Sequence, residues 1–505
     1  MSTETTAPES ASPPAAPRLR ANALGFPQLF AQSVALISPT MTAVLIIALA
    51  FADAGQGTWA AYLFGTIMLL FVVLGLNQFA RRSATAGSMY AYTARGLGPF
   101  AGVLSGWSLI WAYMFIAIAG LGGFAIFCGQ FLQAIHVHGA DGPFFFWAIS
   151  LAGCFLVAWK DIRLSSMLTL VFEGLSVACI LALAAVILFK HGVTIQTSQL
   201  KLSGVKLKGM DFAIVICIFS LVGFESATAV GGEAKRPLKD VPRAVIWSLV
   251  ATGGFMVIMS YVEVYGTRHY GTPLSSITAP LNTLASIYGV SFFKVPVSLG
   301  AMASFFALSL SCINAGSRII FPLAGHGFLP RRLHRTHSTN LTPHTAIAIY
   351  MVLIGSIPVS EHLFHTSPLT IFNDAGTCAA FGFLFAYFSI DIAAPFYLRR
   401  LGALRRRHVA IAVIGFLLLL VPTVGCFYPA PPWPVNLFPY IFLGWMLVGG
   451  TRLYAMHRRQ PGALEAIERD LEATLQASEH AAVEHGGAHD ALGAPVVAVP
   501  QGAIA

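Results

Sequence analysis

The sequence predicts an all-α integral membrane protein with about twelve transmembrane helices. Of its 505 residues, 56% are hydrophobic and only 10% are charged, whereas soluble domains carry about 25% charged residues. The mean hydropathy is +0.73. Apolar runs of about 20 residues, the length of a helix that crosses a bilayer, recur along the chain. Helices are expected because backbone groups in lipid must form hydrogen bonds within their own segment.

Apolar runs between clusters of proline, glycine and charged residues define the expected spans. They cover residues 28–52, 58–80, 100–134, 143–159, 164–189, 211–232, 243–266, 292–320, 344–360, 368–396, 410–428 and 434–456. Residues 1–24 are rich in Pro, Ala, Ser and Thr and lack an apolar core, so we expect a disordered tail and no cleaved signal peptide. We expect residues 457–505 to form a second tail, which leaves residues 25–456 as the membrane domain.

The positive charges predict the orientation of the chain. With the N-terminus inside, 24 of the 30 Lys and Arg residues fall on one side of the membrane. Because Lys and Arg concentrate in cytoplasmic loops, both termini are predicted to be cytoplasmic, in a multi-pass protein of the inner or plasma membrane. The net charge of +9 then belongs to these loops and does not indicate nucleic-acid binding. The seven cysteines lack metal-ligand spacing, so no metal site is expected.

Two expected spans carry residues that interrupt a helix near its middle. In the first, "AQSVALISPTMTAVLIIALAF" (31–51), Pro39 removes an amide donor and clashes with the preceding turn. In the sixth, Gly223 lies beside Glu225, and a carboxylate at membrane depth costs about 2.5–3.5 kcal/mol on insertion scales. Either interruption alone is compatible with an ordinary kink. Interruptions at corresponding places in two halves of a chain indicate a transporter site between inverted repeats.

Three further segments carry the motifs of one known family. They are "SATAGSMYAYTARGLGPFAGVLSGW" (83–107), "GFESATAVGGEAKRPLKDVPRAV" (223–245) and "NAGSRIIFPLAGHGFLPRRLHRTHSTNLTP" (314–343). Together with "YLRR" (397–400), they resemble the amino acid–polyamine–organocation (APC) transporters, and the resemblance covers about residues 28–456. It implies the LeuT-type fold, in which five-plus-five inverted repeats are followed by two extra helices and helices 1 and 6 are discontinuous. The repeats would cover about 28–190 and 211–396, and the extra helices about 410–456.

The resemblance also implies a function. It predicts a secondary active transporter of amino acids or related small amines that works by alternating access, either coupled to protons or as an exchanger. We expect no enzymatic activity and no cofactor, with H+ or Na+ as the coupling ion and a monomer or homodimer as the assembly. The alternatives are a transporter-like sensor without net flux and a permease for another organic cation or anion. A channel is disfavoured because no filter repeat is visible.

The substrate is expected to bind at the two interruptions. In the family, the first helix usually breaks at glycines whose amides receive a substrate carboxylate. Here "ISPTM" (37–41) offers fewer free amides, with hydroxyl groups in their place. Trp111 and Tyr113 of the third span are expected to line the cavity, and Phe219 is either an aromatic residue that closes over the substrate or part of the core. The predicted substrate-binding residues are Ile37, Ser38, Pro39, Thr40, Met41, Trp111, Tyr113, Phe219, Val222, Gly223 and Phe224.

Four polar residues are candidates for coupling. Glu225 has three possible roles: it could accept an ammonium group, brace the interrupted backbone or exchange a proton, and the resemblance favours the last two. Glu173 in the fifth span is either a proton site or a glutamate bonded to a neighbouring hydroxyl group. Ser309 and Ser311 would reach a sodium ion near the first helix, or would only pack between helices.

Overall fold

The computed structural model describes residues 19–20, 22–83, 89–137, 142–160, 162–190, 197–201, 205, 209–268, 273–428 and 433–470. Within these residues the regular secondary structure is helical, apart from two isolated backbone bridges, Leu24–Ala234 and Gly55–Val205. Most of the two expected tails falls outside the described residues, so their disorder stays a prediction.

Eleven helices of the described chain are long and apolar enough to cross a membrane. The first passes through α1 (Phe26–Ile37), α2 (Pro39–Met41), the π-helix η1 (Thr42–Ile46) and α3 (Ile47–Ala54), and the sixth through α10 (Met210–Leu221) and α11 (Ser226–Ala229). The others are α4 (Thr58–Ala80), α6 (Pro99–Ala134), α7 (Pro143–Lys160), α8 (Ile162–Lys190), α12 (Pro237–Thr267), α14 (Lys294–Gly325), α15 (His344–Leu363), α16 (Pro368–Arg400) and α17 (Arg406–Gly425).

A further helix, α18 (Phe438–Arg459), lies where the twelfth span was expected. It has 22 residues, but three basic residues occupy its last turn, and it is not apolar enough to be counted with the eleven. Shorter helices connect the long ones. They are α5 (Met89–Leu97), α9 (Thr197–Leu200), α13 (Pro280–Ile287), η3 (Gly231–Glu233), η4 (Leu274–Ser276), η5 (Ser291–Phe293), η6 (Arg331–Leu333) and η7 (Val435–Leu437).

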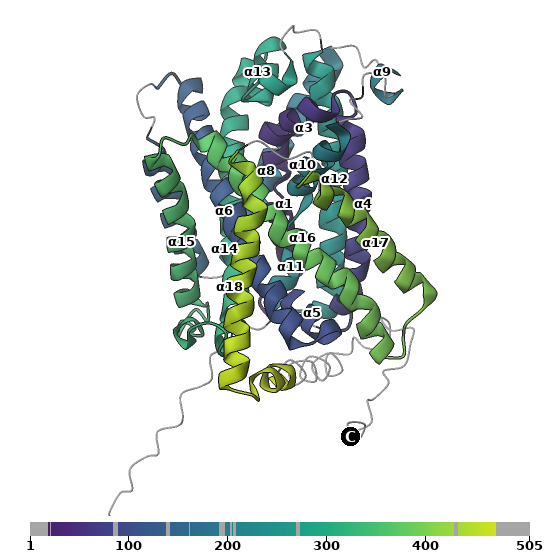
Figure 1. The fold of residues 1–505 in the computed structure, drawn as a ribbon. Helices are drawn as coiled ribbons and strands as arrows, with labels where there is room; N and C mark the ends of the chain where they lie inside the picture. Colours follow the sequence, from purple (N-terminus) through teal and green to yellow (C-terminus); the bar gives the residue numbers. More distant parts are fainter. Residues whose placement is uncertain are drawn as a thin grey trace, which may run out of the picture.

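The two composite helices lie at the centre of the bundle (Figure 1). In both, 83% of the most apolar stretch is buried, against 28% in α17 at the periphery. Helix α1 packs on α8, α12 and α14, and α10 packs on α3, α4 and α17. Figure 1 shows α13 at one end of the bundle and α5 at the other. We call these the α13 end and the α5 end.

Small residues allow the long helices to approach closely. Helix α6 packs along both α14 and α16. A Cβ atom added at Gly120 would lie 2.3 Å from the Ser309 hydroxyl oxygen, and one added at Gly123 would lie 2.2 Å from the Phe305 ring, both on α14. Such close approach is typical of membrane helices, because dispersion contacts and interhelical hydrogen bonds hold them together. The packed helices form a frame around the two interrupted ones.

Candidate functional site

The first helix is interrupted at Ser38, as the proline beside it predicted. Ser38 has φ 51° and ψ 73°, a left-handed conformation that is uncommon outside glycine. Pro39 then begins α2 and offers no amide hydrogen, so the regular hydrogen-bond ladder stops here. The π-helical turn η1 follows at once. Strained backbone of this kind persists only where its surroundings fix it, and it often marks a functional site.

A buried carboxylate holds the first interruption in place. The amide of Thr40 donates to Glu173 Oε1 of α8 at 3.0 Å, and the amide of Met41 donates to the Ser38 hydroxyl oxygen at 3.3 Å. The Ser304 hydroxyl of α14 also donates to Glu173, and it lies 2.9 Å from the Ser38 hydroxyl. Glu173 is only 2% exposed. One side chain therefore ties α2, α8 and α14 together at the interruption.

The sixth helix is interrupted between α10 and α11, where the sequence placed Gly223. Val222 is extended, and Gly223 has φ 107°, which side chains rarely allow. A Cβ atom at Gly223 would lie 2.2 Å from Leu36 Cδ2 and 3.1 Å from the Leu36 carbonyl carbon. The two interruptions are thus in direct contact, and the absence of a side chain at Gly223 permits that contact.

A second buried carboxylate holds the sixth-helix interruption. Glu225 accepts hydrogen bonds from the Gly223 amide at 3.1 Å and from the hydroxyl groups of Tyr113 and Tyr387, both at 2.8 Å. It is fully buried. The ring of Phe224 stacks on Tyr387 with centroids 5.2 Å apart, so α16 supports this interruption on two sides.

Hydrogen bonds also join the two interrupted helices to each other on the α5 side. The Ser33 hydroxyl donates to the Phe224 carbonyl at 2.7 Å and accepts from the Ala227 amide at 3.1 Å. The Ser226 hydroxyl donates to the Gln32 carbonyl at 3.1 Å. These hydrogen bonds join α1 to α11 and to the residue that follows Gly223.

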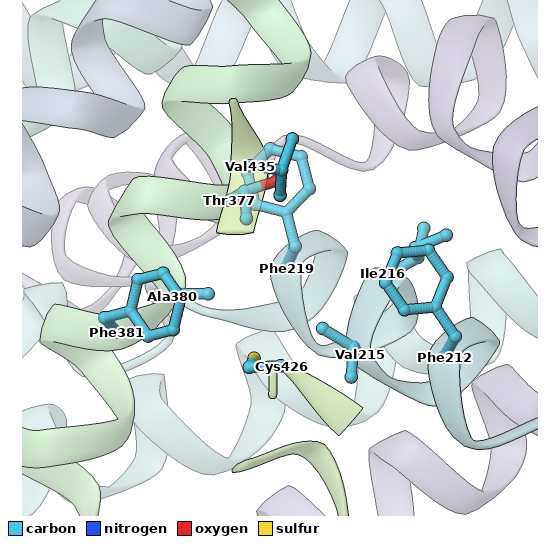
Figure 2. A pocket seen from close by; sticks show the side chains of 9 residues that line it. All are labelled: Phe212, Val215, Ile216, Phe219, Thr377, Ala380, Phe381, Cys426 and Val435. Atoms are coloured by element: carbon cyan, nitrogen blue, oxygen red, sulfur yellow. The ribbon is translucent and has the colours of Figure 1, made fainter. Parts of the chain in front are cut away.

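Phe219 lines a small apolar cavity on the α13 side of the sixth-helix interruption (Figure 2). The cavity holds about 60 Å³. Its lining comes from α10, α16 and the segments after α17, namely Phe212, Val215, Ile216, Phe219, Thr377, Ala380, Phe381, Cys426 and Val435. A Cβ atom at Gly376 would lie 2.3 Å from the Phe219 ring, so this ring fits closely against α16. Its closing role stays a prediction.

Trp111 and Tyr113 were both expected to line the cavity, but the structure gives them different surroundings. The Tyr113 hydroxyl is bonded to Glu225, as described above. The Trp111 indole donates to the Cys378 carbonyl of α16 at 2.7 Å, and its ring packs on Trp445 of α18. Trp111 thus contacts α16 and α18, whereas Tyr113 bonds the glutamate at the sixth-helix interruption.

The two serines proposed for a sodium site also differ in their hydrogen bonds. The Ser309 hydroxyl donates to the Ala117 carbonyl of α6 at 3.2 Å. The Ser311 hydroxyl is buried and has no hydrogen-bond partner among the described residues, and the Ser311 carbonyl accepts from the Gln32 amide group at 2.9 Å. The Gln32 side-chain oxygen is likewise buried without a partner in the described part of the chain. A sodium site stays a prediction, and within the described residues no group of three His, Cys, Asp or Glu residues could hold a metal ion.

A third set of contacts, toward the α5 end, joins the segment before α1 to η3 and to α14. The amides of Ala23 and Leu24 donate to the Glu233 carbonyl at 2.8 and 3.0 Å, and the Lys235 amide donates to the Leu24 carbonyl at 2.8 Å. The Arg318 guanidinium of α14 forms an ion pair with the Glu233 carboxylate, and both side chains are at most 1% exposed. We call these five residues the latch. Sequence reasoning did not identify it.

The sequence also did not indicate Tyr387 and Ser304, two of the residues that donate hydrogen bonds to the two glutamates. Both lie on spans that the sequence placed correctly, but neither stands beside a helix-breaking residue or a charge. Their only sequence signal is a hydroxyl group inside an apolar span, which is common packing material in membrane helices. Their hydrogen-bond partners lie on other helices, so these contacts depend on how the helices pack and not on the local sequence.

Comparison with known proteins agrees with this architecture. The model of the family described as "Amino acid permease" matches residues 28–446, which is most of the chain and includes both interruptions. The chain belongs to the amino acid permease family. The resemblance to APC transporters in the sequence motifs is thereby confirmed. This family consists of transporters, so the permease is assigned to transport across a membrane and not to an enzyme class.

The names of curated relatives of this permease refer to different substrates. It is 22% identical over 329 residues to the branched-chain amino acid permease BcaP of Bacillus subtilis, covering 61% of this chain and 69% of the relative. It is 27% identical over 361 residues to BcaP of Lactococcus lactis, covering 66% and 73%. It is 21% identical over 351 residues to the low-affinity putrescine importer PlaP of Escherichia coli, covering 67% and 73%.

Proposed function

We propose that this permease is a secondary active transporter that binds an amino acid or a small amine between its two interrupted helices and carries it by alternating access. The observation that carries the proposal is the direct contact of two interruptions, each held by a buried glutamate. Discontinuous helices at the centre of a bundle are typical substrate sites of secondary transporters. The names of the relatives, which refer to branched-chain amino acids and to putrescine, support this range of substrates.

We further propose the LeuT-type arrangement, with inverted repeats over about 28–190 and 211–396 and with α17 and α18 as the extra helices. The interruption of the first and of the sixth span supports it, because these are corresponding positions in two halves of five spans. The α5 end is proposed to face the cytoplasm, since most of the Lys and Arg residues lie in the segments that connect the helices there. Both termini are then cytoplasmic.

The proposed function is tested by counterflow in proteoliposomes. Vesicles loaded with an unlabelled amino acid or amine should accumulate the same labelled compound transiently, because an alternating-access carrier exchanges substrate across the membrane. A sensor would bind its ligand and show no exchange. A permease for other organic ions would exchange those ions and neither amines nor amino acids, so both compound classes belong in the assay.

The first interruption gives a mutational test of the site. We expect the variant Ser38→Val/Thr40→Val to insert and fold but to lose substrate binding. It removes the hydroxyl that accepts from the Met41 amide and the one that donates to Ser176 at 2.9 Å. Binding is measured by calorimetry on purified protein, and Thr451→Val on α18, where the hydroxyl bonds only within its own helix, serves as the control. Unchanged affinity in the double variant would place the site elsewhere.

We propose protons as the coupling ion, with Glu173 and Glu225 as the candidate carriers. Uptake should then follow an imposed pH gradient and be independent of sodium. Glutamine at the responsible position should abolish accumulation driven by the gradient but retain exchange, because Gln keeps the shape of Glu and cannot carry a proton. Uptake that requires sodium at fixed pH would contradict this and would favour a site at Ser309 and Ser311.

A further inference from the structure

The backbone donors of the first interruption are already occupied. Freed amides at an interrupted helix ordinarily serve to bind the carboxylate of an anionic or zwitterionic substrate. Here Pro39 has no amide hydrogen, the Thr40 amide donates to the Glu173 carboxylate, and the Met41 amide donates to the Ser38 hydroxyl. The carboxylate that these amides would receive from an amino acid is thus supplied by the protein itself.

Two buried carboxyl groups lie at the interruptions. Glu173 and Glu225 are both buried, and within the described residues their hydrogen-bond partners are hydroxyl groups and backbone amides, with no Lys or Arg among them. The buried Arg318 is paired with Glu233 in the latch. A substrate carboxylate would add a third acidic group to a region of low dielectric constant, where like charges repel strongly. A cation would meet two groups that can carry the opposite charge.

Unpartnered oxygen atoms also line the first helix. Among the described residues, the side-chain oxygen atoms of Gln32, Thr42 and Ser311 are buried and have no hydrogen-bond partner. Gln32 and Ser311 are adjacent, because the Gln32 amide nitrogen donates to the Ser311 carbonyl at 2.9 Å. The Gln32 side-chain oxygen can only accept a hydrogen bond, and the two hydroxyl groups can accept as well as donate. An ammonium group has three N–H donors and no acceptor, so it complements the Gln32 oxygen and can donate to either hydroxyl group.

We infer that the substrate of this site is a cationic organic amine that lacks a carboxylate, and that Glu173 occupies the place where the carboxylate of an amino acid would bind. This inference rests on the proposed transport function and narrows its substrate class. It reverses the ordinary expectation for an interrupted first helix, in which backbone amides select a carboxylate. Glu173 then contributes to specificity in two ways. It occupies the position where a substrate carboxylate would bind, and it attracts the ammonium group of the amine.

The inference is tested with pairs of compounds that differ only by the carboxylate. Binding of leucine and 3-methylbutylamine, of ornithine and putrescine, and of lysine and cadaverine is measured by calorimetry on the purified full-length protein. In at least one pair we expect the amine to bind about tenfold or more tightly than its amino acid, since a buried like charge is strongly unfavourable. Amino acids that bind as tightly as their amines, or more tightly, would overturn the inference.

Variants of Glu173 provide a second test. Glu173→Ala exposes the Thr40 amide, so it should weaken amine binding about tenfold and raise amino acid binding relative to amine binding. Glu173→Gln keeps an oxygen for the amide and loses the charge, so it should weaken amine binding without that relative gain. Asp391→Asn is the matched control, because Asp391 is a buried carboxyl group between Gly75 and Gly415, on α4 and α17. It should leave the ratio unchanged.

The outcomes separate the inference from the proposed function. Counterflow of amino acids without counterflow of amines would overturn the inference and leave the transporter intact. The absence of counterflow with every amine and amino acid would overturn both. An unchanged ratio of amine to amino acid binding in Glu173→Ala, in protein that unfolds at the wild-type temperature, would also overturn the role given to Glu173.

Discussion

Replacing Gly223 with leucine is expected to abolish transport while the protein still inserts and folds. The backbone at Gly223 has φ 107°, and a side chain held in such a region costs about 1–3 kcal/mol. A Cβ atom would also lie 2.2 Å from the Leu36 side chain, so leucine would force the two interruptions apart. Counterflow in proteoliposomes measures the loss of transport, and size-exclusion chromatography with thermal unfolding measures whether the fold survives.

Gly254 supplies the matched control for this substitution. It lies in α12, is exposed on the surface of the bundle, and has no atom within 4 Å of an added Cβ. Gly254→Leu should therefore transport at the wild-type rate. Wild-type transport by Gly223→Leu would mean that the close contact between the interruptions is not needed at any step of the cycle.

The second large effect is expected at the ion pair of the latch. Arg318→Met would leave the Glu233 carboxylate buried without its cation, and breaking a buried pair in this way costs about 3–5 kcal/mol. We expect a lower unfolding temperature in detergent and a higher reactivity of cysteines introduced at the α5 end. The double variant Arg318→Met/Glu233→Leu should recover part of the stability, because apolar residues of similar size often replace a buried pair without loss.

An ion pair that is exposed on both sides serves as the control. Arg469 lies 3.7 Å from Glu465, and their side chains are 75% and 73% exposed. Pairs of this kind contribute about 0–1 kcal/mol, so Arg469→Met should unfold close to the wild-type temperature. If Arg318→Met unfolds at the same temperature as Arg469→Met, the ion pair of the latch does not stabilise the fold.

The interruptions could be predicted from the sequence because their causes are local. Pro39 acts on its own turn of helix, and Gly223 permits a backbone conformation that needs no knowledge of its neighbours. The presence of a carboxylate beside Gly223 added a cost that only a functional or bracing role would offset. Apolar length likewise predicted twelve spans. Eleven of them coincide with helices of the described chain that are long and apolar enough to cross a membrane, and the twelfth coincides with the less apolar α18.

The partners of the site residues could not be predicted, because they depend on how each helix is rotated about its axis. Successive residues turn by about 100° around a helix, so Trp111 and Tyr113 point in different directions although only one residue separates them. Tyr113 reaches Glu225, while Trp111 packs against α16 and α18. For Glu173 the sequence left a proton site and a hydrogen-bonded glutamate as alternatives. The structure shows its hydrogen bonds, and its coupling role stays a prediction.

The latch carries a consequence for how this permease responds to cold. Opening of the α5 end in the proposed transport cycle would separate three main-chain hydrogen bonds and a buried ion pair. Separating them is enthalpically costly before water replaces the lost partners. Where this opening limits the rate, we expect turnover to slow steeply on cooling, and a variant without the ion pair to depend less on temperature.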